Sequence, residues 1–234
     1  MENLLEVHDI HTFIGPFHIL QGVTVNVPKG SITALLGRNG AGKTTTLKSV
    51  LGITPPRQGR VVFDGQEIQG RRTFEISALG IGFVPDYRAI FRDLSVAENL
   101  QIAERRKGDL NRKAEMIFGL FPDLNRLIGL RGNQLSGGQQ QMLAIARALV
   151  ADNKLLLIDE PTEGLAPVLI EQLMKAILQL SAETTVLLVE QNFTVANQLA
   201  KQYVIIEEGR SVKSGAMADL VHDQETIRRY LGAA

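Results

Sequence analysis

The sequence predicts an α/β fold with a mostly parallel core sheet, an N-terminal antiparallel β subdomain and an inserted helical subdomain. Segments with helical spacing separate four apolar runs, at residues 32–37, 80–85, 154–161 and 184–191. Continuous apolar runs are typical of parallel strands that are buried on both faces. A β-rich N-terminus and a long helical stretch between the second and third runs predict the two subdomains.

The N-terminal part alternates short β-rich runs with turn signals. Such runs lie at residues 4–10, 19–27 and 59–68. Within the last run, the pair Asp64 and Gly65 favours a tight hairpin turn, because both residue types tolerate positive φ. We therefore expect a small antiparallel sheet in this part of the chain.

Residues 95–151 form the predicted helical subdomain. Helical patterns lie at residues 95–106, 111–121 and 139–149, and no strand signal separates them. Because this stretch falls between two core runs, it is expected to be an insertion into the α/β core.

The C-terminal part closes the fold after the fourth apolar run. Residues 203–215 have the pattern of a hairpin, and residues 225–232 that of a short helix. No internal repeat or low-complexity tract interrupts the chain. Residues 1–234 are therefore expected to form a single domain.

The composition excludes several classes of function. Lys and Arg together number 25, and so do Asp and Glu, so no net charge attracts nucleic acid. The absence of cysteine excludes disulfides and thiolate metal sites. The apolar runs are far shorter than the roughly 20 residues that span a bilayer, and the N-terminus lacks an apolar signal core. We expect a soluble chain that binds no nucleic acid.

Residues 37–44, GRNGAGKT, match the P-loop pattern G-x-x-x-x-G-K-[ST]. The motif follows an apolar run and precedes a helical one, which is the context that a P-loop requires. Its backbone N–H groups can surround a β-phosphate, Lys43 can reach the β- and γ-phosphate oxygens, and the Thr44 hydroxyl can ligate Mg²⁺. The expected nucleotide contacts are Gly37, Arg38, Asn39, Gly40, Ala41, Gly42, Lys43, Thr44 and Thr45.

Two acids follow the apolar run KLLLI and supply the second half of a hydrolytic site. Ligands of open α/β sheets bind at the carboxyl ends of the strands, where this run presents Asp159 and Glu160. Asp159 is suited to holding Mg²⁺ through its water shell. Glu160, on the other side of the strand, can polarise a water for attack on the γ-phosphorus. The residues therefore predict nucleotide hydrolysis.

Three motifs in this order resemble those of the ATP-binding cassette (ABC) family: the P-loop at residues 37–44, LSGGQ at 135–139 and LLLIDEP at 155–161. The resemblance covers nearly the whole chain. It implies that LSGGQ covers an ATP held by the P-loop of a facing subunit, in a head-to-tail dimer. Ser136 and the backbone of Gly137 and Gly138 would contact the γ-phosphate, and the helix that starts at Gln139 would aim its dipole there.

Departures from the common family pattern indicate a subfamily. Asp86 stands where most members carry a glutamine that senses Mg²⁺ and the membrane subunit. Gln191 stands where the family has a switch histidine, and its amide can bond a γ-phosphate oxygen without titrating. Ala166 replaces a customary aspartate. Together with ETIRRYLG near the C-terminus, these features resemble the smaller of two paired cassettes in branched-chain amino acid importers.

The position that stacks on adenine in most family members holds Ile14 in this chain. Phe13 or Phe17 could substitute for it, although aromatic residues of a β subdomain more often pack in a core. The resemblance therefore implies loose selection of the base.

The resemblance implies an ATPase that uses ATP and Mg²⁺ to power import of branched-chain amino acids. Its implied partners are two transmembrane permeases, a second ABC ATPase in a heterodimer or homodimer, and an extracytoplasmic substrate-binding protein. The implied location is peripheral, on the cytoplasmic face of the cell membrane. The closest alternative is import of urea, an amide or another amino acid, because no ATPase residue contacts the cargo. A non-catalytic regulator is the other alternative.

Overall fold

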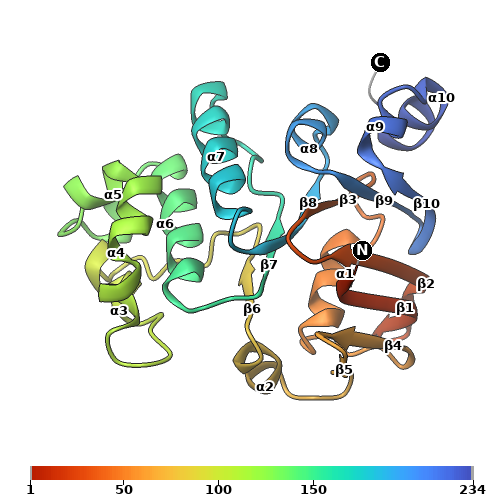
Figure 1. Ribbon diagram of the computed structural model, residues 1–234, viewed down its shortest axis with the longest axis horizontal. Coiled ribbons are helices and arrows are strands. Elements are labelled where there is room, and N and C mark those ends of the chain that lie inside the picture. The colour runs from red at the N-terminus through yellow and green to blue at the C-terminus, as the bar shows by residue number, and fades with distance from the viewer. Residues whose placement is uncertain (1, 233–234) are drawn as a thin grey trace.

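The computed structural model describes residues 2–232, which fold around two sheets (Figure 1). The strands and helices alternate along the chain in the order that the sequence predicts for an α/β fold. The strands are β1 Asn3–Ile14, β2 Phe17–Pro28, β3 Ile32–Leu36, β4 Gln58–Phe63, β5 Gln66–Glu67, β6 Ile81–Val84, β7 Leu155–Asp159, β8 Thr185–Glu190, β9 Gln202–Glu207 and β10 Arg210–Ala216. The main helices are α1 Lys43–Val50, α2 Thr73–Ala78, α3 Val96–Gln101, α4 Asp109–Leu120, α5 Pro122–Arg126, α6 Gly137–Val150, α7 Pro167–Leu180, α8 Phe193–Leu199, α9 Met217–Leu220 and α10 Gln224–Thr226.

The core sheet has six strands in the order β10-β9-β3-β8-β7-β6. All neighbours are parallel except the β9–β10 hairpin. The four apolar runs are β3, β6, β7 and β8, so the predicted parallel sheet is confirmed. Strands β3, β7 and β8 are buried along their whole length, which explains why their sequences lack polar alternation.

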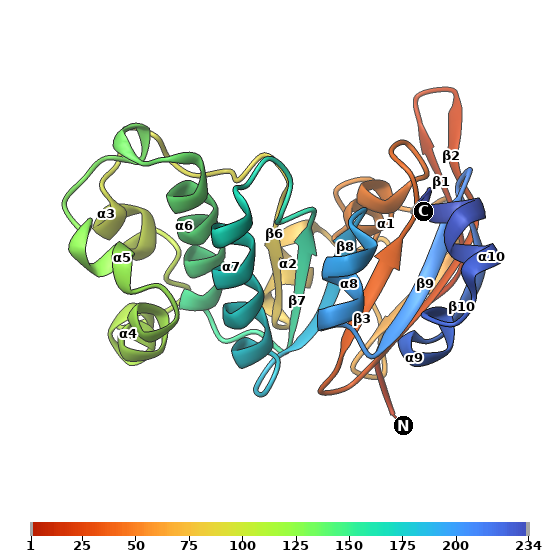
Figure 2. The same cartoon turned by 90° about the horizontal axis from the view of Figure 1, so that it is seen from above.

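Two hydrophobic clusters cover opposite faces of the core sheet. Alternate residues of β7 belong to different clusters. Leu156 and Ile158 pack in the cluster that includes α6, α7 and α8, whereas Leu155 and Leu157 pack in the cluster that includes α1, β1 and β2. Figure 2 shows α6, α7 and α8 beside the core strands, with β1 and β2 at the far end. Both faces of every central strand are thus covered.

The N-terminal sheet has the order β2-β1-β4-β5 and is antiparallel throughout. The predicted turn joins β4 to β5, and both Asp64 (φ 49°) and Gly65 (φ 74°) adopt positive φ there. This is the conformation that a two-residue hairpin of this type requires. The antiparallel N-terminal sheet is therefore confirmed.

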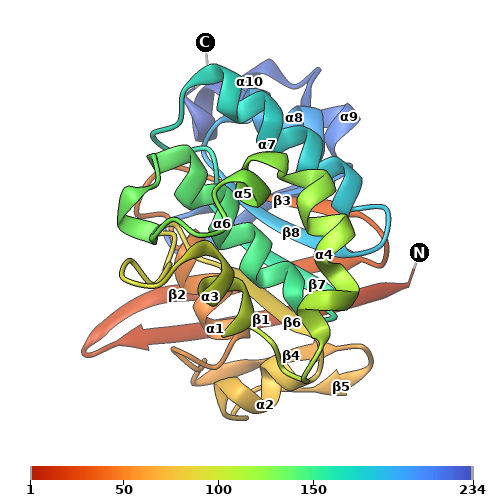
Figure 3. The same cartoon turned by 90° about the vertical axis from the view of Figure 1, so that its left-hand side faces the viewer.

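Helices α3 to α6 gather at one end of the molecule, where Figure 3 views them face on. The helix predicted over residues 95–106 is shorter, because α3 ends at Gln101. Glu104 and Asp109 accept hydrogen bonds from backbone N–H groups of residues 105–110, which holds that segment as a turn leading into α4. In this segment, hydrogen bonds from backbone N–H groups to acidic side chains take the place of the helical hydrogen bonds that the prediction required.

The C-terminal hairpin β9–β10 has the predicted position, and α9 follows it. The helix expected over residues 225–232 begins as α10 and continues as a π-helical turn, Ile227–Leu231. Within residues 2–232, no helix combines the length and hydropathy that crossing a bilayer needs.

Candidate active site

The loop between β3 and α1 has positive φ at several glycines, and two of them serve different purposes. Gly37 has φ 147°, and a Cβ there would lie 2.2 Å from the Ile206 carbonyl oxygen. Gly40 has φ 79° but faces open space, because no atom lies within 4 Å of where a Cβ would be. Gly37 is therefore needed for packing on β9, whereas Gly40 leaves room for a ligand to approach the backbone.

The Lys43 side chain is folded back over this loop and is only 4% exposed. Its Nζ donates hydrogen bonds to the Gly37 carbonyl at 3.0 Å and to the Arg38 carbonyl at 3.1 Å. The same Nζ lies 3.0 Å from Glu160 Oε1. The cation is thus held by one carboxylate and two carbonyls at the entrance to the loop, where a phosphate could replace the carboxylate.

Asp159 closes β7 opposite the start of α1. Thr44 Oγ1 donates to Asp159 Oδ1 at 3.2 Å, whereas Asp159 Oδ2 is buried without a hydrogen-bond partner among residues 2–232. Burial raises the pKa of Asp159 to about 6, and the negative charges of Asp86 and Glu160 act in the same direction. A buried oxygen without a partner normally marks the place of an unseen ligand or ion.

Glu160 follows β7 in a left-handed backbone conformation with φ 43°. Its N–H donates to the Val189 carbonyl at 2.9 Å, which anchors the turn to β8. A left-handed conformation is unfavourable for a residue with a side chain and is concentrated at functional sites. Here it lets two consecutive acids both contact the P-loop, Asp159 through Thr44 and Glu160 through Lys43.

The P-loop and Glu160 border a cavity of about 450 Å³. Most of the predicted nucleotide contacts line it, together with Asp86, Glu160 and the two aliphatic side chains Ile14 and Ile19. Gly37, Arg38 and Ala41 do not line it, and Arg38 and Ala41 instead border a smaller cavity beside Tyr230 on the other side of the loop. The larger cavity is lined by Ile14, Ile19, Asn39, Gly40, Gly42, Lys43, Thr44, Thr45, Asp86, Glu160 and Glu163.

Of the predicted metal ligands, Thr44 and Asp86 line this cavity, whereas Asp159 does not line it and contacts Thr44 through a hydrogen bond. No group of three or more His, Asp or Glu side chains within residues 2–232 is placed to hold a metal by itself. The donor set that is present, one hydroxyl and one buried carboxylate, fits Mg²⁺ only if phosphate oxygens and water complete the coordination. The unpartnered Oδ2 of Asp159 agrees with that fit.

Gln191 is exposed and lies in the loop after β8. It borders a neighbouring cavity of about 300 Å³ that also contacts Glu160. Glu160 therefore borders both cavities. Sequence reasoning missed Glu190, which is buried at the end of β8 beside Gln191. One sequence signal could have identified Glu190. It is an acid at the end of an apolar strand, and that strand pairs with the strand that leads into the P-loop.

The two N-terminal phenylalanines that could stack on a base differ in burial: Phe17 is exposed and Phe13 is half-buried. Phe17 is 69% exposed, so the expected core position is wrong for this residue, which lies at the exposed start of β2. Phe13 is half-buried, stacked on His18 at 4.1 Å between ring centroids, with the Arg57 guanidinium 4.5 Å from its centroid. Ile14 is half-exposed and lies in the cavity itself. An aliphatic surface therefore borders the place where a base would lie.

The LSGGQ turn lies at the start of α6, on the other side of α7 from α1 (Figure 2). Ser136 caps this helix, because its Oγ accepts from the Gln139 N–H at 3.3 Å and its own N–H donates to Gln139 Oε1 at 2.9 Å. A Cβ on Gly138 would lie 2.3 Å from Leu169 Cδ1 of α7. Ser136 and Gly137 are exposed, so the turn faces solvent.

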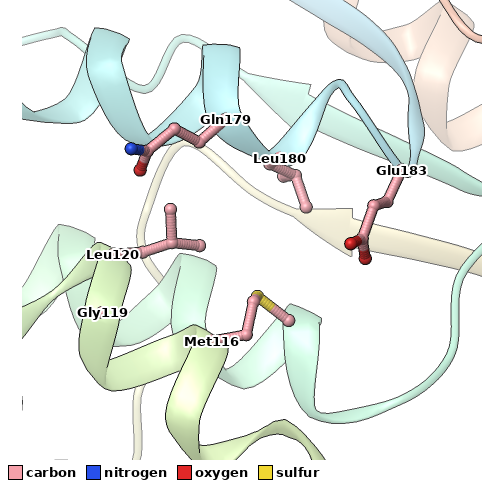
Figure 4. Close-up of a pocket in the computed structure, with 6 residues that line it drawn as sticks. All are labelled: Met116, Gly119, Leu120, Gln179, Leu180 and Glu183. Carbon is pink, nitrogen blue, oxygen red and sulfur yellow. The ribbon is translucent and has the colours of Figure 1, made fainter.

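A further cavity of about 340 Å³ separates α4 from the end of α7 (Figure 4). Met116 and Leu120 of α4 face Leu180 of α7 across it, with Glu183 at one side. The residues that line this cavity include no cationic side chain and no glycine-rich loop, so it lacks the chemistry that binds phosphate.

A P-loop with its lysine, an acidic pair on the next strand but one and a cavity between them define a P-loop nucleoside triphosphatase. The sequence profile of the ABC transporter family matches residues 20–163. The chain therefore belongs to the ABC transporter family, and it is an ATP-binding ATPase subunit of that family, as the motifs predicted.

Three similar proteins illustrate the match. The chain is 39% identical to the high-affinity branched-chain amino acid transport ATP-binding protein BraG of Pseudomonas aeruginosa, over 98% of this chain and 100% of BraG. It is 35% identical to the probable branched-chain amino acid transport ATP-binding protein LivF of Archaeoglobus fulgidus, over 92% and 93% of the two chains. The structure of cbiO1 from Clostridium perfringens, part of the ABC transporter complex cbiONQ, is 25% identical, with a TM-score of 0.84 over 98% and 94% of the two chains.

Proposed function

We propose that this chain powers the import of branched-chain amino acids through partner membrane permeases. The observation that carries the proposal is the 39% identity to BraG over the full length of that transport protein. The subfamily features at Asp86, Ala166 and Gln191 support the same assignment. In this proposal residues 1–234 are one ABC ATPase domain, with residues 95–151 as its helical subdomain.

The nucleotide binds in the cavity that the P-loop and Glu160 border. Backbone N–H groups of residues 37–42 and the ammonium of Lys43 hold the β- and γ-phosphates, because both present positive charge to the same region. Thr44 and Asp159 hold Mg²⁺, with Asp86 at the edge of the cavity. When bound, Mg²⁺ neutralises charge that develops on the phosphate oxygens.

Glu160 is the general base for the attacking water. Its carboxylate oxygen Oε1 lies 3.0 Å from Lys43 Nζ. A γ-phosphate that binds Lys43 competes with this carboxylate and releases it toward a water molecule. Glu160 then accepts the proton of that water while the water oxygen attacks the γ-phosphorus, and ADP leaves. Gln191 donates its amide hydrogen bond to a γ-phosphate oxygen.

The signature turn acts on a nucleotide held by a facing cassette. The exposed Ser136 and Gly137 begin a helix of 14 residues, whose N-terminal partial charge is positive and suits a phosphate. Two cassettes arranged head to tail enclose two nucleotides. ATP binding closes the pair, and hydrolysis with phosphate release opens it. The facing cassette is a second ABC ATPase, in a heterodimer or a homodimer.

The membrane partners are two permease subunits that dock near the loop of residues 86–93. Tyr87 and Phe91 of this loop are 71% and 45% exposed, which offers apolar contact area to a partner. An extracytoplasmic binding protein selects the cargo, and the ATPase works at the cytoplasmic face of the membrane.

Reconstitution of the chain with its permeases, the second cassette and the extracytoplasmic binding protein tests this function. Uptake of labelled leucine into vesicles should require internal ATP and should be reduced by unlabelled isoleucine and valine. Uptake that is instead reduced by urea or short amides would assign a different cargo to the same ATPase. ATP hydrolysis without any ATP-dependent uptake would reject the importer assignment.

A further inference from the structure

The Glu190 carboxyl is an acid that the hydrolysis scheme above does not use. It ends β8, the strand between β3 and β7, and is 2% exposed. None of the ion pairs formed within residues 2–232 includes Glu190. Burial raises the pKa of this carboxyl above its usual range. Burying a carboxyl without an ion-pair partner costs free energy, so the presence of Glu190 at this position requires an explanation.

Glu190 joins two loops through its two oxygens. Thr162 Oγ1 donates to Oε1 at 2.7 Å, and the Asn192 N–H donates to Oε2 at 3.3 Å. Thr162 follows Glu160 by two residues, and Asn192 directly follows Gln191. One buried carboxyl therefore connects the loop that carries the proposed general base to the loop that carries the proposed γ-phosphate contact.

The connected loops form one wall of the 300 Å³ cavity. The residues that line it include the three members of the network and the two functional residues beside them. They are Glu160, Thr162, Glu163, Ile170, Glu190, Gln191 and Asn192. The left-handed backbone of Glu160 makes the first loop dependent on such support, because a strained residue keeps its conformation only when its surroundings fix it.

We propose that Glu190 is a positioning residue, which holds Glu160 and Gln191 in register with the same γ-phosphate through Thr162 and Asn192. This inference rests on the proposed hydrolytic function. The P-loop belongs to β3 and α1, whereas the hydrogen bonds of the Glu190 carboxyl go to Thr162 and Asn192. Loss of the network therefore lowers kcat and leaves nucleotide affinity in place.

A pair of substitutions at Thr162 isolates the hydrogen bond. Thr162→Val removes the hydroxyl and keeps the side-chain shape, whereas Thr162→Ser keeps the hydroxyl. Loss of a hydrogen bond to a charged or buried acceptor corresponds to roughly tenfold or more in rate if the bond supports the transition state. We expect kcat of Thr162→Val to fall by about that factor, with the dissociation constant of a fluorescent ATP analogue changed by less than about twofold. Thr162→Ser should keep most of the activity.

Glu190 itself is tested by Glu190→Gln and Glu190→Leu. The amide oxygen of Glu190→Gln still accepts from Thr162, so this variant should keep more activity than Glu190→Leu. The double variant Thr162→Val with Glu190→Leu should be no slower than the slower single variant, because Glu190→Leu already removes the hydrogen bond that Thr162→Val deletes. Ser31→Ala is the control, since it removes another buried hydroxyl, which donates to the Pro28 carbonyl at 2.7 Å at the opposite end of β3.

The outcomes separate this inference from the proposed function. A wild-type chain and a Ser31→Ala variant that both fail to hydrolyse ATP would overturn the two together. Hydrolysis by Thr162→Val at the wild-type rate, or additive losses in the double variant, would overturn the positioning role alone. A fall in activity that follows only the fall in melting temperature across all variants, Ser31→Ala included, would also overturn it.

Discussion

Lys43 Nζ and Glu160 Oε1 lie 3.0 Å apart, so the proposed phosphate-binding cation and the proposed general base neutralise each other. Both side chains are largely buried, at 4% and 14% exposed. A buried pair of this kind leaves a costly charge behind when one partner is removed. In the proposed mechanism the γ-phosphate replaces Glu160 as the partner of Lys43, which would link nucleotide binding to release of the base.

Glu160→Gln should bind ATP at least as tightly as the wild type and hydrolyse it at least roughly 100-fold more slowly, because the amide keeps the shape and lacks the basicity. Nucleotide titration and phosphate release measure the two effects. Glu163→Gln is the matched control, since Glu163 lines the same cavity without contacting Lys43. Equal loss of activity in both variants would contradict the assignment of Glu160 as the base.

Lys43→Ala should weaken ATP binding by roughly tenfold or more, because charge-assisted hydrogen bonds to phosphate are lost. Lys48→Ala removes a lysine from the same helix α1 outside the cavity and serves as the control. Equilibrium titration with a fluorescent nucleotide measures both. Unchanged affinity in Lys43→Ala would place the phosphates elsewhere.

Gly138→Ala should lower stability by about 1–3 kcal/mol, because its Cβ would lie 2.3 Å from Leu169 Cδ1 and would force the Leu169 side chain to move. Gly137→Ala should cost much less, since the nearest atom to its Cβ is the flexible Arg88 Nη1 at 3.2 Å. Urea unfolding measures the difference. The combination of Gly138→Ala with Leu169→Ala should recover part of the loss, and no recovery would refute the packing explanation.

Asp159→Asn should stabilise the nucleotide-free, magnesium-free chain in a pH-dependent way. The native pKa of about 6 lies above the ordinary value of 3.8. The wild type therefore keeps its full stability below pH 4 and loses stability as the pH rises through about 6. At pH 8 the variant should gain roughly 1–3 kcal/mol over the wild type, and the gain should vanish near pH 4. A gain that is constant across this range would disprove the burial argument.

Much of the fold was accessible from local sequence patterns. The continuous apolar runs identify β3, β6, β7 and β8, because a strand that is buried on both faces leaves no polar alternation. Helix α3 is shorter than predicted because carboxylates at Glu104 and Asp109 cap backbone groups beyond it. Capping of this kind depends on where a side chain points, which periodicity does not report.

The site was only partly accessible from the sequence. The P-loop spacing locates Lys43 and Thr44, since phosphate binding demands those residue types in that order. The left-handed backbone of Glu160 and the hydrogen bonds of Glu190 were not predicted. Both arise from contacts between β7 and β8, two strands that are far apart in the sequence.

The central claim is that one chain's P-loop and a facing chain's signature turn enclose the same nucleotide. The chain contains no cysteine, so cysteines introduced at the exposed positions Asn39 and Ser136 report only on this contact. In a Glu160→Gln background, ATP should induce a disulfide-linked dimer of the Asn39→Cys, Ser136→Cys variant on a non-reducing gel, and neither single-cysteine variant should form it. Cross-linking that is independent of ATP would contradict the claim, and so would its absence with ATP bound both in the chain alone and in a complex with a second cassette that carries the equivalent cysteines.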